Sequence, residues 1–235
     1  MNPRTTIMFL TIALAAAGCG TGPPDDTSPA GLENGSFTAA LNGFDIHYEV
    51  HGKGPVLMTL PNSWGLSLEG LRALYRPLEA HLTMVYFDPR GMGRSGPIRE
   101  EADMGMAAIR DDFDALRRHL GLDRVHAIGW SNGAENLILL ASERPETIDR
   151  AIFLHGIASF GPEEMAYITE KHPDWVAEYA AFQERMASAD LTKEEQNIAV
   201  REYFIEIGFP PSFADPEVAA ESLPRIYANA GFSWA

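Results

Sequence analysis

Residues 127–134 read AIGWSNGA, and this stretch places Ser131 between two glycines, Gly129 and Gly133. It follows the apolar run 125–128 and precedes a segment rich in alanine and leucine. A short buried strand, an abrupt turn and a helix are the context in which a G-x-S-x-G pattern carries chemistry. We therefore take Ser131 as the candidate nucleophile.

The physical reason for these residue types is steric and electrostatic. A serine on a tight strand-to-helix turn takes a strained backbone conformation, and flanking glycines let the strand and the helix pass closely around it. The free N–H groups and the positive dipole end of the following helix then point to the space where an oxyanion would develop during acyl transfer. The alternative interpretation is a small-residue turn before a helix, with no chemistry.

Composition limits the classes of function. The 235 residues are 46% hydrophobic, which indicates one globular domain, or one domain with an insertion. The formal net charge of −15 argues against binding to nucleic acid or to anionic lipid through a basic patch, because both need clustered lysine and arginine. The sequence shows no metal-ligand cluster, nucleotide loop or repeat, so we expect no metal and no cofactor.

The first residues have the pattern of a targeting segment, and we predict a signal peptide over residues 1–19. Arg4 supplies a positive charge, 7–17 an apolar stretch, and Ala-Ala-Gly precedes Cys19. This end resembles the lipobox of bacterial lipoproteins, with Ala16 in place of the usual leucine. The resemblance implies secretion across the bacterial inner membrane, cleavage before Cys19 and a lipid anchor in the cell envelope. An ordinary secretory signal or an uncleaved anchor is the alternative.

The folded body alternates strands and helices after a linker, residues 20–35, whose composition predicts disorder. Alternation with short connections predicts a mostly parallel sheet with helices on both faces over residues 36–160. Ligands of such sheets bind at the carboxyl ends of the strands, where Ser131 lies. The expected strands are 36–41, 44–50, 55–60, 82–87, 125–128 and 151–154, and the expected helices are 68–80, 103–120 and 134–144. The first two strands are joined by Asn42-Gly43, a dipeptide that suits a type I′ hairpin.

Residues 161–235 contain only helical patterns, and we interpret them as a helical lid above the sheet. Thr192 and Glu195 predict a capping box at one helix start, and a further helix is expected from Pro216 to the last residue. An aromatic stripe in this region could line an acyl pocket, although such stripes are more often core. It consists of Trp175, Tyr179, Phe182 and Met186.

The pattern resembles the α/β-hydrolase fold over residues 37–161, and three motifs carry the resemblance. One is the GWSNG turn, which is similar to the nucleophile elbow of that family. Another is DPRGMGRS, residues 88–95, which is similar to the D-x-R-G-x-G-x-S loop of lidded esterases, epoxide-hydrolase relatives and proline-iminopeptidase-like peptidases. The last is residues 61–65, where the family usually has His-Gly.

The resemblance implies an oxyanion hole made by two backbone N–H groups, those of Trp64 and Asn132. The 61–65 segment departs from the family, because Asn62-Ser63 replaces His-Gly. Asp88 and Arg90 are expected to hold their loop by a charged hydrogen bond to each other.

In this family the triad follows the chain order serine, acid, histidine, with the last two on loops after later strands. Only the six strands above are predicted, so we expect a chain truncated before those strands and a weak or inactive catalyst on its own. An open sheet edge that invites pairing with another chain is also expected.

Three further residues are candidates for the substrate pocket. His155 ends the strand expected beside that of Ser131, and we interpret it as a pocket residue rather than the base. Glu163 and Glu164 open the lid, where acids of peptidase relatives bind a substrate amine. The alternative interpretation, without a binding role, is that this acidic pair forms a solvent-exposed helix N-terminus.

The leading hypothesis is a serine hydrolase that acts on esters or small amides through an acyl-enzyme on Ser131. One alternative is a proline-iminopeptidase-like aminopeptidase. Another is a non-catalytic protein that binds its ligand on a hydrolase scaffold. The sequence predicts a small-molecule substrate and leaves its identity and the oligomeric state open.

Overall fold

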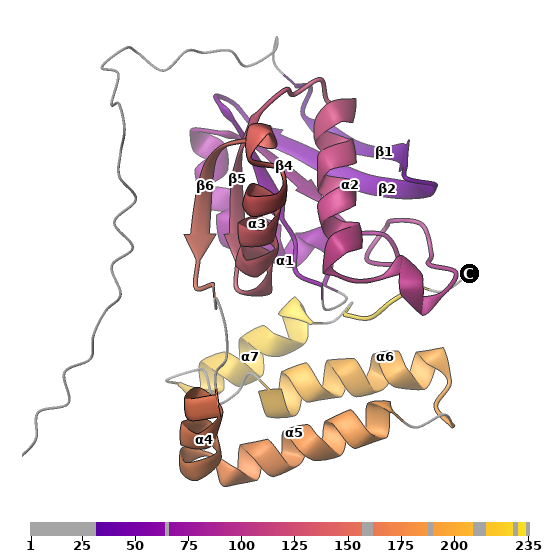
Figure 1. Cartoon of the computed structure of the whole chain (residues 1–235), viewed down its shortest axis with the longest axis vertical. Coiled ribbons are helices and arrows are strands. Elements are labelled where there is room, and N and C mark those ends of the chain that lie inside the picture. The colour runs from indigo at the N-terminus through magenta and orange to yellow at the C-terminus, as the bar shows by residue number, and fades with distance from the viewer. Residues whose placement is uncertain are drawn as a thin grey trace, which may run out of the picture.

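A six-stranded sheet forms the centre of the computed structural model (Figure 1). The strands are β1 (Gly35–Leu41), β2 (Phe44–Gly52), β3 (Val56–Leu60), β4 (Thr83–Phe87), β5 (Val125–Trp130) and β6 (Ile148–Leu154), in the order β1-β2-β4-β3-β5-β6. β3 to β6 run parallel, while β1 and β2 are antiparallel to their neighbours. The mostly parallel sheet is confirmed. The structure describes residues 32–63, 66–156, 162–187, 190–208, 215–227 and 230–233.

Helices cover both faces of this sheet, as predicted. The first three are α1 (Leu68–Tyr75), α2 (Met106–His119) and α3 (Asn132–Glu143). Side chains alternate between the faces along β3: Leu57 belongs to a cluster with α1, and Met58 to a larger cluster with α2 and α3. Figure 1 shows α2 and α3 on the near face and α1 behind the sheet. The strands are therefore apolar on both sides because both sides are covered.

The first two strands form the predicted hairpin. Leu41 pairs with Phe44, and the two residues between them have positive φ, 52° at Asn42 and 83° at Gly43. A two-residue connection with positive φ at both positions matches a type I′ turn, whose twist suits the flanking strands.

Several element boundaries differ from the prediction. α1 ends at Tyr75, and residues Arg76–Ala80 form a 3₁₀ helix instead, because Pro77 lacks the N–H that would continue the helix. α2 begins three residues later than expected, after Gly105 takes a φ of 116°. β6 begins at Ile148, earlier than expected. Leu32, placed in the linker, packs against the main core cluster.

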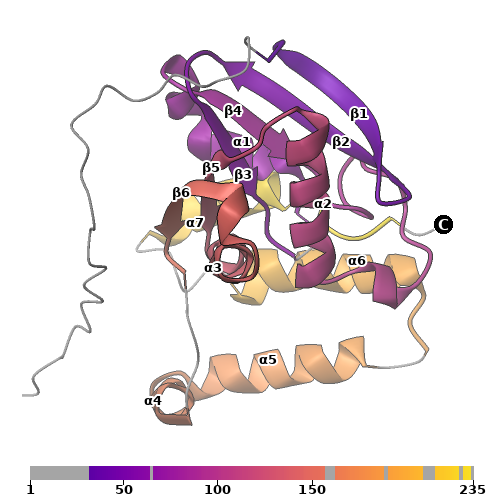
Figure 2. The same ribbon diagram turned by 45° about the horizontal axis from the view of Figure 1, so that its top comes forward.

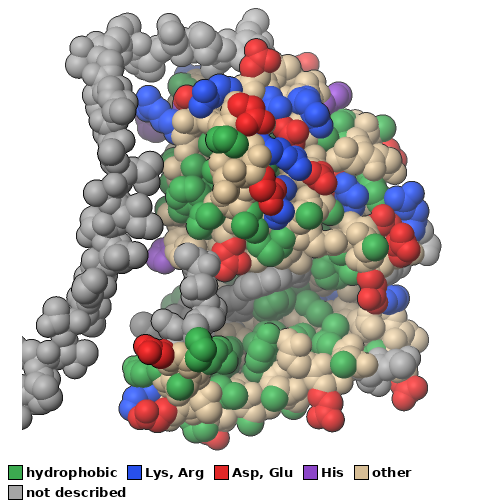
Figure 3. Space-filling view, viewed as in Figure 1, with side chains coloured by type: hydrophobic (Ala, Val, Ile, Leu, Met, Phe, Trp, Pro, Cys, Tyr) green, Lys and Arg blue, Asp and Glu red, His purple; other side chains and the backbone are tan. Residues whose placement is uncertain are grey.

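The outer face of α2 and α3 carries charges of both signs. Figure 3 shows arginine and lysine interspersed with aspartate and glutamate on this side of the molecule. One ion pair joins the two helices, with 2.9 Å between Arg110 Nη2 and Glu143 Oε1. The face is therefore electrostatically mixed and presents no basic surface to an anionic partner.

β6 forms one edge of the described sheet and pairs with β5 alone. Its side chains Ile152 and Phe153 are 43% and 46% exposed, and Ile138 and Leu139 of α3 are exposed as well. An unpaired strand with apolar side chains is a surface on which another strand can pair. The exposed edge expected from the sequence is thus present in the described residues.

The C-terminal helices form a separate layer beyond the ends of the strands (Figures 1 and 2). They are α4 (Pro162–Lys171), α5 (Pro173–Met186), α6 (Lys193–Glu202), a π-helical turn at Tyr203–Gly208, and α7 (Pro216–Ile226). No described helix combines the length and the apolar character needed to cross a membrane.

This layer has a hydrophobic cluster, which Leu66 from the loop before α1 joins. Phe182 stacks on Tyr203 with 4.3 Å between ring centroids, and Phe204 stacks on Tyr227 at 4.9 Å. Tyr179 contacts Tyr203 as well. Of the predicted aromatic stripe, Phe182 thus packs against this cluster, while Tyr179 is 39% exposed.

The predicted capping box is confirmed at the start of α6, where Thr192 Oγ1 accepts a hydrogen bond from the Glu195 N–H and Thr192 N donates to Glu195 Oε2. The prediction that the last helix runs to the final residue is wrong, because α7 ends at Ile226. Residues 230–233 form no helix, and Gly231 has a φ of 137°. This segment exchanges hydrogen bonds with distant residues, which a continued helix would forgo.

Candidate active site

The GWSNG turn has the strained geometry predicted for it. Ser131 lies between the last residue of β5 and the first of α3, with φ 53° and ψ −123°. Its N–H donates to the Leu154 carbonyl at 2.8 Å, and its own carbonyl accepts from Ala134 N at 2.9 Å. These bonds fix the backbone in a region that non-glycine residues rarely occupy. The partly exposed side chain is thus carried on a rigid turn.

The two flanking glycines are required by close backbone approach. A Cβ on Gly129 would overlap the Gly133 carbonyl, and a Cβ on Gly133 would overlap the Leu60 carbonyl. Both obstacles are backbone atoms, which cannot rotate away. The glycines therefore set how closely β3, β5 and α3 meet at Ser131.

The loop after β3 lies against this turn. Leu60 pairs with Gly129, so β3 and β5 end side by side. Ser63 N donates to Asn132 Oδ1 at 3.0 Å, so this N–H is already engaged and does not face a substrate. Asn132 occupies the first position of α3, where the backbone N–H has no partner within the helix. Trp64, the other predicted oxyanion donor, lies outside the described residues.

The DPRGMGRS loop is held differently from the prediction. The buried Asp88 carboxylate accepts hydrogen bonds from Leu68 N at 2.6 Å and Arg94 N at 2.9 Å. Arg90 forms a bidentate pair with the buried Asp112 of α2, at 2.9 and 2.5 Å. The predicted Asp88–Arg90 bond is therefore wrong, because the loop turns the two side chains toward different elements. Burial raises the pKa of Asp88 above its usual value.

The described residues bring no histidine or carboxylate into hydrogen-bond contact with the Ser131 hydroxyl. His155 comes nearest by topology, because it follows Leu154, whose carbonyl accepts the Ser131 N–H. Its side chain is exposed and its φ is 50°. Glu163 is exposed on α4, which both ribbon views place away from the start of α3 (Figures 1 and 2). Glu164 lies on the same helix, and its side chain is outside the described part.

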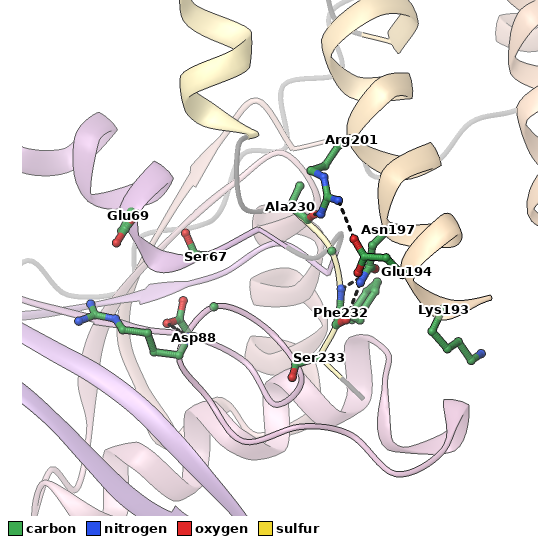
Figure 4. Close-up of a pocket in the computed structure, with 13 residues that line it drawn as sticks. Ser67, Glu69, Asp88, Lys193, Glu194, Asn197, Arg201, Ala230, Phe232 and Ser233 are labelled. Atoms are coloured by element: carbon green, nitrogen blue, oxygen red, sulfur yellow. Dashed lines mark hydrogen bonds and ion pairs between the residues drawn. The ribbon is translucent and has the colours of Figure 1, made fainter. Parts of the chain in front are cut away.

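A cavity of about 680 Å³ lies between the sheet layer and α6. Ser67 and Asp88 line it from the sheet layer, and Asn197 from α6. Figure 4 shows residues 230–233 passing between these two sides, with Asn197 bonded to Phe232. Ser131 does not line this cavity. The polar hollow is therefore a feature of the junction between the layers, separate from the candidate nucleophile.

Within the described ranges, no three histidine, cysteine, aspartate or glutamate side chains come together as metal ligands. The site as described consists of a serine on a strained turn, a helix N-terminus and an adjoining loop. A serine on such a turn beside unpaired backbone N–H groups is an arrangement that can support nucleophilic chemistry.

The fold and this turn define the class of protein. Residues 56–204, more than half of the chain, match the family model described as alpha/beta hydrolase fold. The chain belongs to this family.

The individual curated relatives are longer than this chain and share only about a third of its residues over the matched stretch. The chain is 29% identical over 140 residues to the human serine hydrolase BPHL, covering 58% of this chain and 45% of that protein. It is 34% identical over 107 residues to a proline iminopeptidase of Xanthomonas citri, covering 46% and 33%. The chain spans less than half the length of these curated relatives. A crystal structure of a hydrolase from Pseudomonas aeruginosa matches with a TM-score of 0.56 at 23% identity, covering 83% of this chain and 68% of that one, which shows the fold alone.

Proposed function

We propose that this protein is a serine hydrolase that acts on esters or small amides through an acyl-enzyme on Ser131. The observation that carries the proposal is the backbone of Ser131, held at φ 53° between the end of a parallel strand and the start of α3. A strained serine with glycines on both sides has a functional explanation as a presented nucleophile. The serine hydrolase relatives and the shared family support the same chemistry.

In this mechanism, the Ser131 oxygen attacks the substrate carbonyl carbon while its proton passes to a base. The carbonyl oxygen becomes an oxyanion, which the backbone N–H groups of Asn132 and Trp64 would stabilise. Collapse of the tetrahedral intermediate expels the protonated leaving group, and water then releases the acid from the serine.

A proline-iminopeptidase-like activity is the second enzymatic candidate, because one of the matched relatives has that name. The H-G-G-P-G signature is absent at residues 61–65, which favours the esterase proposal. Turnover of short acyl esters without turnover of proline naphthylamide would support the first proposal, and the reverse result the second. A ligand that raises the melting temperature without turnover would instead favour a non-catalytic binding protein.

A fluorophosphonate probe tests the nucleophile directly, since it phosphonylates activated serines and needs no known substrate. We expect one adduct, which mass spectrometry of the digested protein locates on Ser131. Prior incubation with a short acyl ester should reduce the labelling. An adduct on another serine, or none at saturating probe, would contradict the proposal.

We also propose that the protein is anchored in the cell envelope through Cys19, which lies outside the described residues. The supporting feature is the sequence pattern before this cysteine. Metabolic labelling with a fatty-acid analogue is expected to mark the wild-type protein and to fail on Cys19→Ser. Equal labelling of both proteins would contradict the anchor.

A further inference from the structure

The side chain of Asn132 joins the serine turn to the loop after β3. Its Oδ1 accepts two hydrogen bonds from Ser63, one from the backbone N–H at 3.0 Å and one from the hydroxyl at 2.6 Å. Its Nδ2 donates to Glu135 Oε2 at 3.0 Å, one turn further along α3. Asn132 is 9% exposed, so water competes little for these bonds.

Two of these partners fix the orientation of the amide. The Ser63 N–H can only donate, so the atom that faces it must be the amide oxygen. The Glu135 carboxylate can only accept when ionised, so the atom that faces it must be the amide nitrogen. A flipped amide would place its NH2 group against the Ser63 N–H and its oxygen against the Glu135 carboxylate, and both contacts would be repulsive. Glu135 therefore holds the Asn132 oxygen toward Ser63.

The loop after β3 is thus fastened to the turn at two places. The Leu60 carbonyl packs against Gly133, and Ser63 is bonded to Asn132 three residues later. The Ser63 N–H is therefore engaged and is not itself free to bind an oxyanion.

We infer that the Asn132 side chain is a positioning residue for acyl transfer, held in register by Glu135. Through Ser63 it keeps the loop after β3 at the distance from Ser131 at which a backbone N–H of that loop stabilises the developing oxyanion. The inference rests on the proposed function. It assigns a role to the side chain of Asn132, separate from the role proposed for its backbone N–H.

The chain offers a complementary pair of substitutions as a test. Asn132→Asp alone places two carboxylates in contact, whereas Glu135→Gln alone replaces a group that can only accept by an amide that can also donate, which weakens the orientation of Asn132. The double variant restores the hydrogen-bond pattern, because an aspartate at position 132 accepts from Ser63 and from the glutamine amide. Its total charge equals that of the wild type. Glu143→Gln is the matched control, the same change at the other end of α3, where Glu143 pairs with Arg110.

Two measurements are made on each variant of the full chain. One is the second-order rate constant of phosphonylation at Ser131, and the other is hydrogen exchange at the backbone N–H groups of Asn62 and Ser63. We expect Asn132→Asp to react about tenfold more slowly or worse, since loss of one oxyanion donor costs 100-fold or more in other acyl-transfer sites, and Glu135→Gln to react more slowly by a smaller factor. Their exchange should be faster, and the double variant should recover both values. The control should match the wild type.

Each other outcome contradicts the inference. Faster exchange with an unchanged reaction rate would make the tie purely structural. Unchanged exchange would show that it does not hold the loop, and a double variant no better than the single variants would reject the orienting role of Glu135. If the wild type is not labelled at Ser131, the proposed function fails together with the inference. A labelled wild type with equally reactive variants rejects the inference alone.

Discussion

Ser131→Ala is expected to abolish covalent labelling and to lower ester hydrolysis at this site by about 1,000-fold or more. The change removes the oxygen that forms the acyl bond, and fixed N–H donors alone retain only the residual part of the catalysis. The second-order rate constant with the fluorophosphonate probe measures the loss without knowledge of the natural substrate. Labelling of Ser131→Ala at the wild-type rate would show that another residue reacts.

A second variant separates lost chemistry from lost folding. Ser131→Gly also removes the hydroxyl, but glycine tolerates the φ of 53° that strains serine and alanine. Because a strained backbone of this kind costs about 1 to 3 kcal/mol, we expect Ser131→Gly to be at least as stable as Ser131→Ala in urea unfolding. Both should be unreactive. A reactive glycine variant would reject Ser131 as the nucleophile.

Gly129→Ala is expected to lower the free energy of unfolding by about 3 kcal/mol or more. The added Cβ would overlap the Gly133 carbonyl and approach Ala134 N, which belong to the first turn of α3. These backbone atoms move only if the helix moves away from β5. Urea unfolding followed by circular dichroism measures the loss, and a falling labelling rate in the folded fraction would report the displaced serine.

Gly70→Ala is the matched control for this change. Gly70 lies inside α1, and the space around its Cβ position is open. Alanine is the better helix former, so we expect unchanged stability or a gain of up to about 1 kcal/mol. If the two alanine variants were equally stable, the close contact at Gly129 would not constrain the fold.

Much of the fold could be predicted because its signals are local. Apolar runs and helical spacing predicted the strands and helices, and Asn42-Gly43 predicted the hairpin turn. The end of α7 could not be predicted, since residues 230–233 leave the helical path for partners far away in sequence. Ser233 N donates to the Gly91 carbonyl, and Phe232 bonds to Asn197. These hydrogen bonds between distant residues form only in the folded chain.

In the candidate site, too, local features could be predicted and contacts between residues distant in sequence could not. Ser131 could be found because its neighbours in sequence are also its neighbours in space. The Asp88–Arg90 pairing was wrong for the opposite reason, because the partner of Arg90 is Asp112 on another element. The Ser63–Asn132 tie joins residues 69 positions apart. The sequence holds one local signal of this tie, which is the spacing of Asn132 and Glu135. This spacing indicates a contact within the first turn of a helix but does not reveal Ser63 as a partner.

The aromatic cluster of the helical layer has a consequence for how substitutions combine. Tyr203 and Phe204 share their interior with neighbouring helices and with Leu66, whereas Phe113 belongs to the sheet core. Substitutions in groups that share no partners add independently in their effect on stability. A variant that combines a change at Tyr203 with a change at Phe113 is therefore expected to lose the sum of the two single losses in free energy of unfolding.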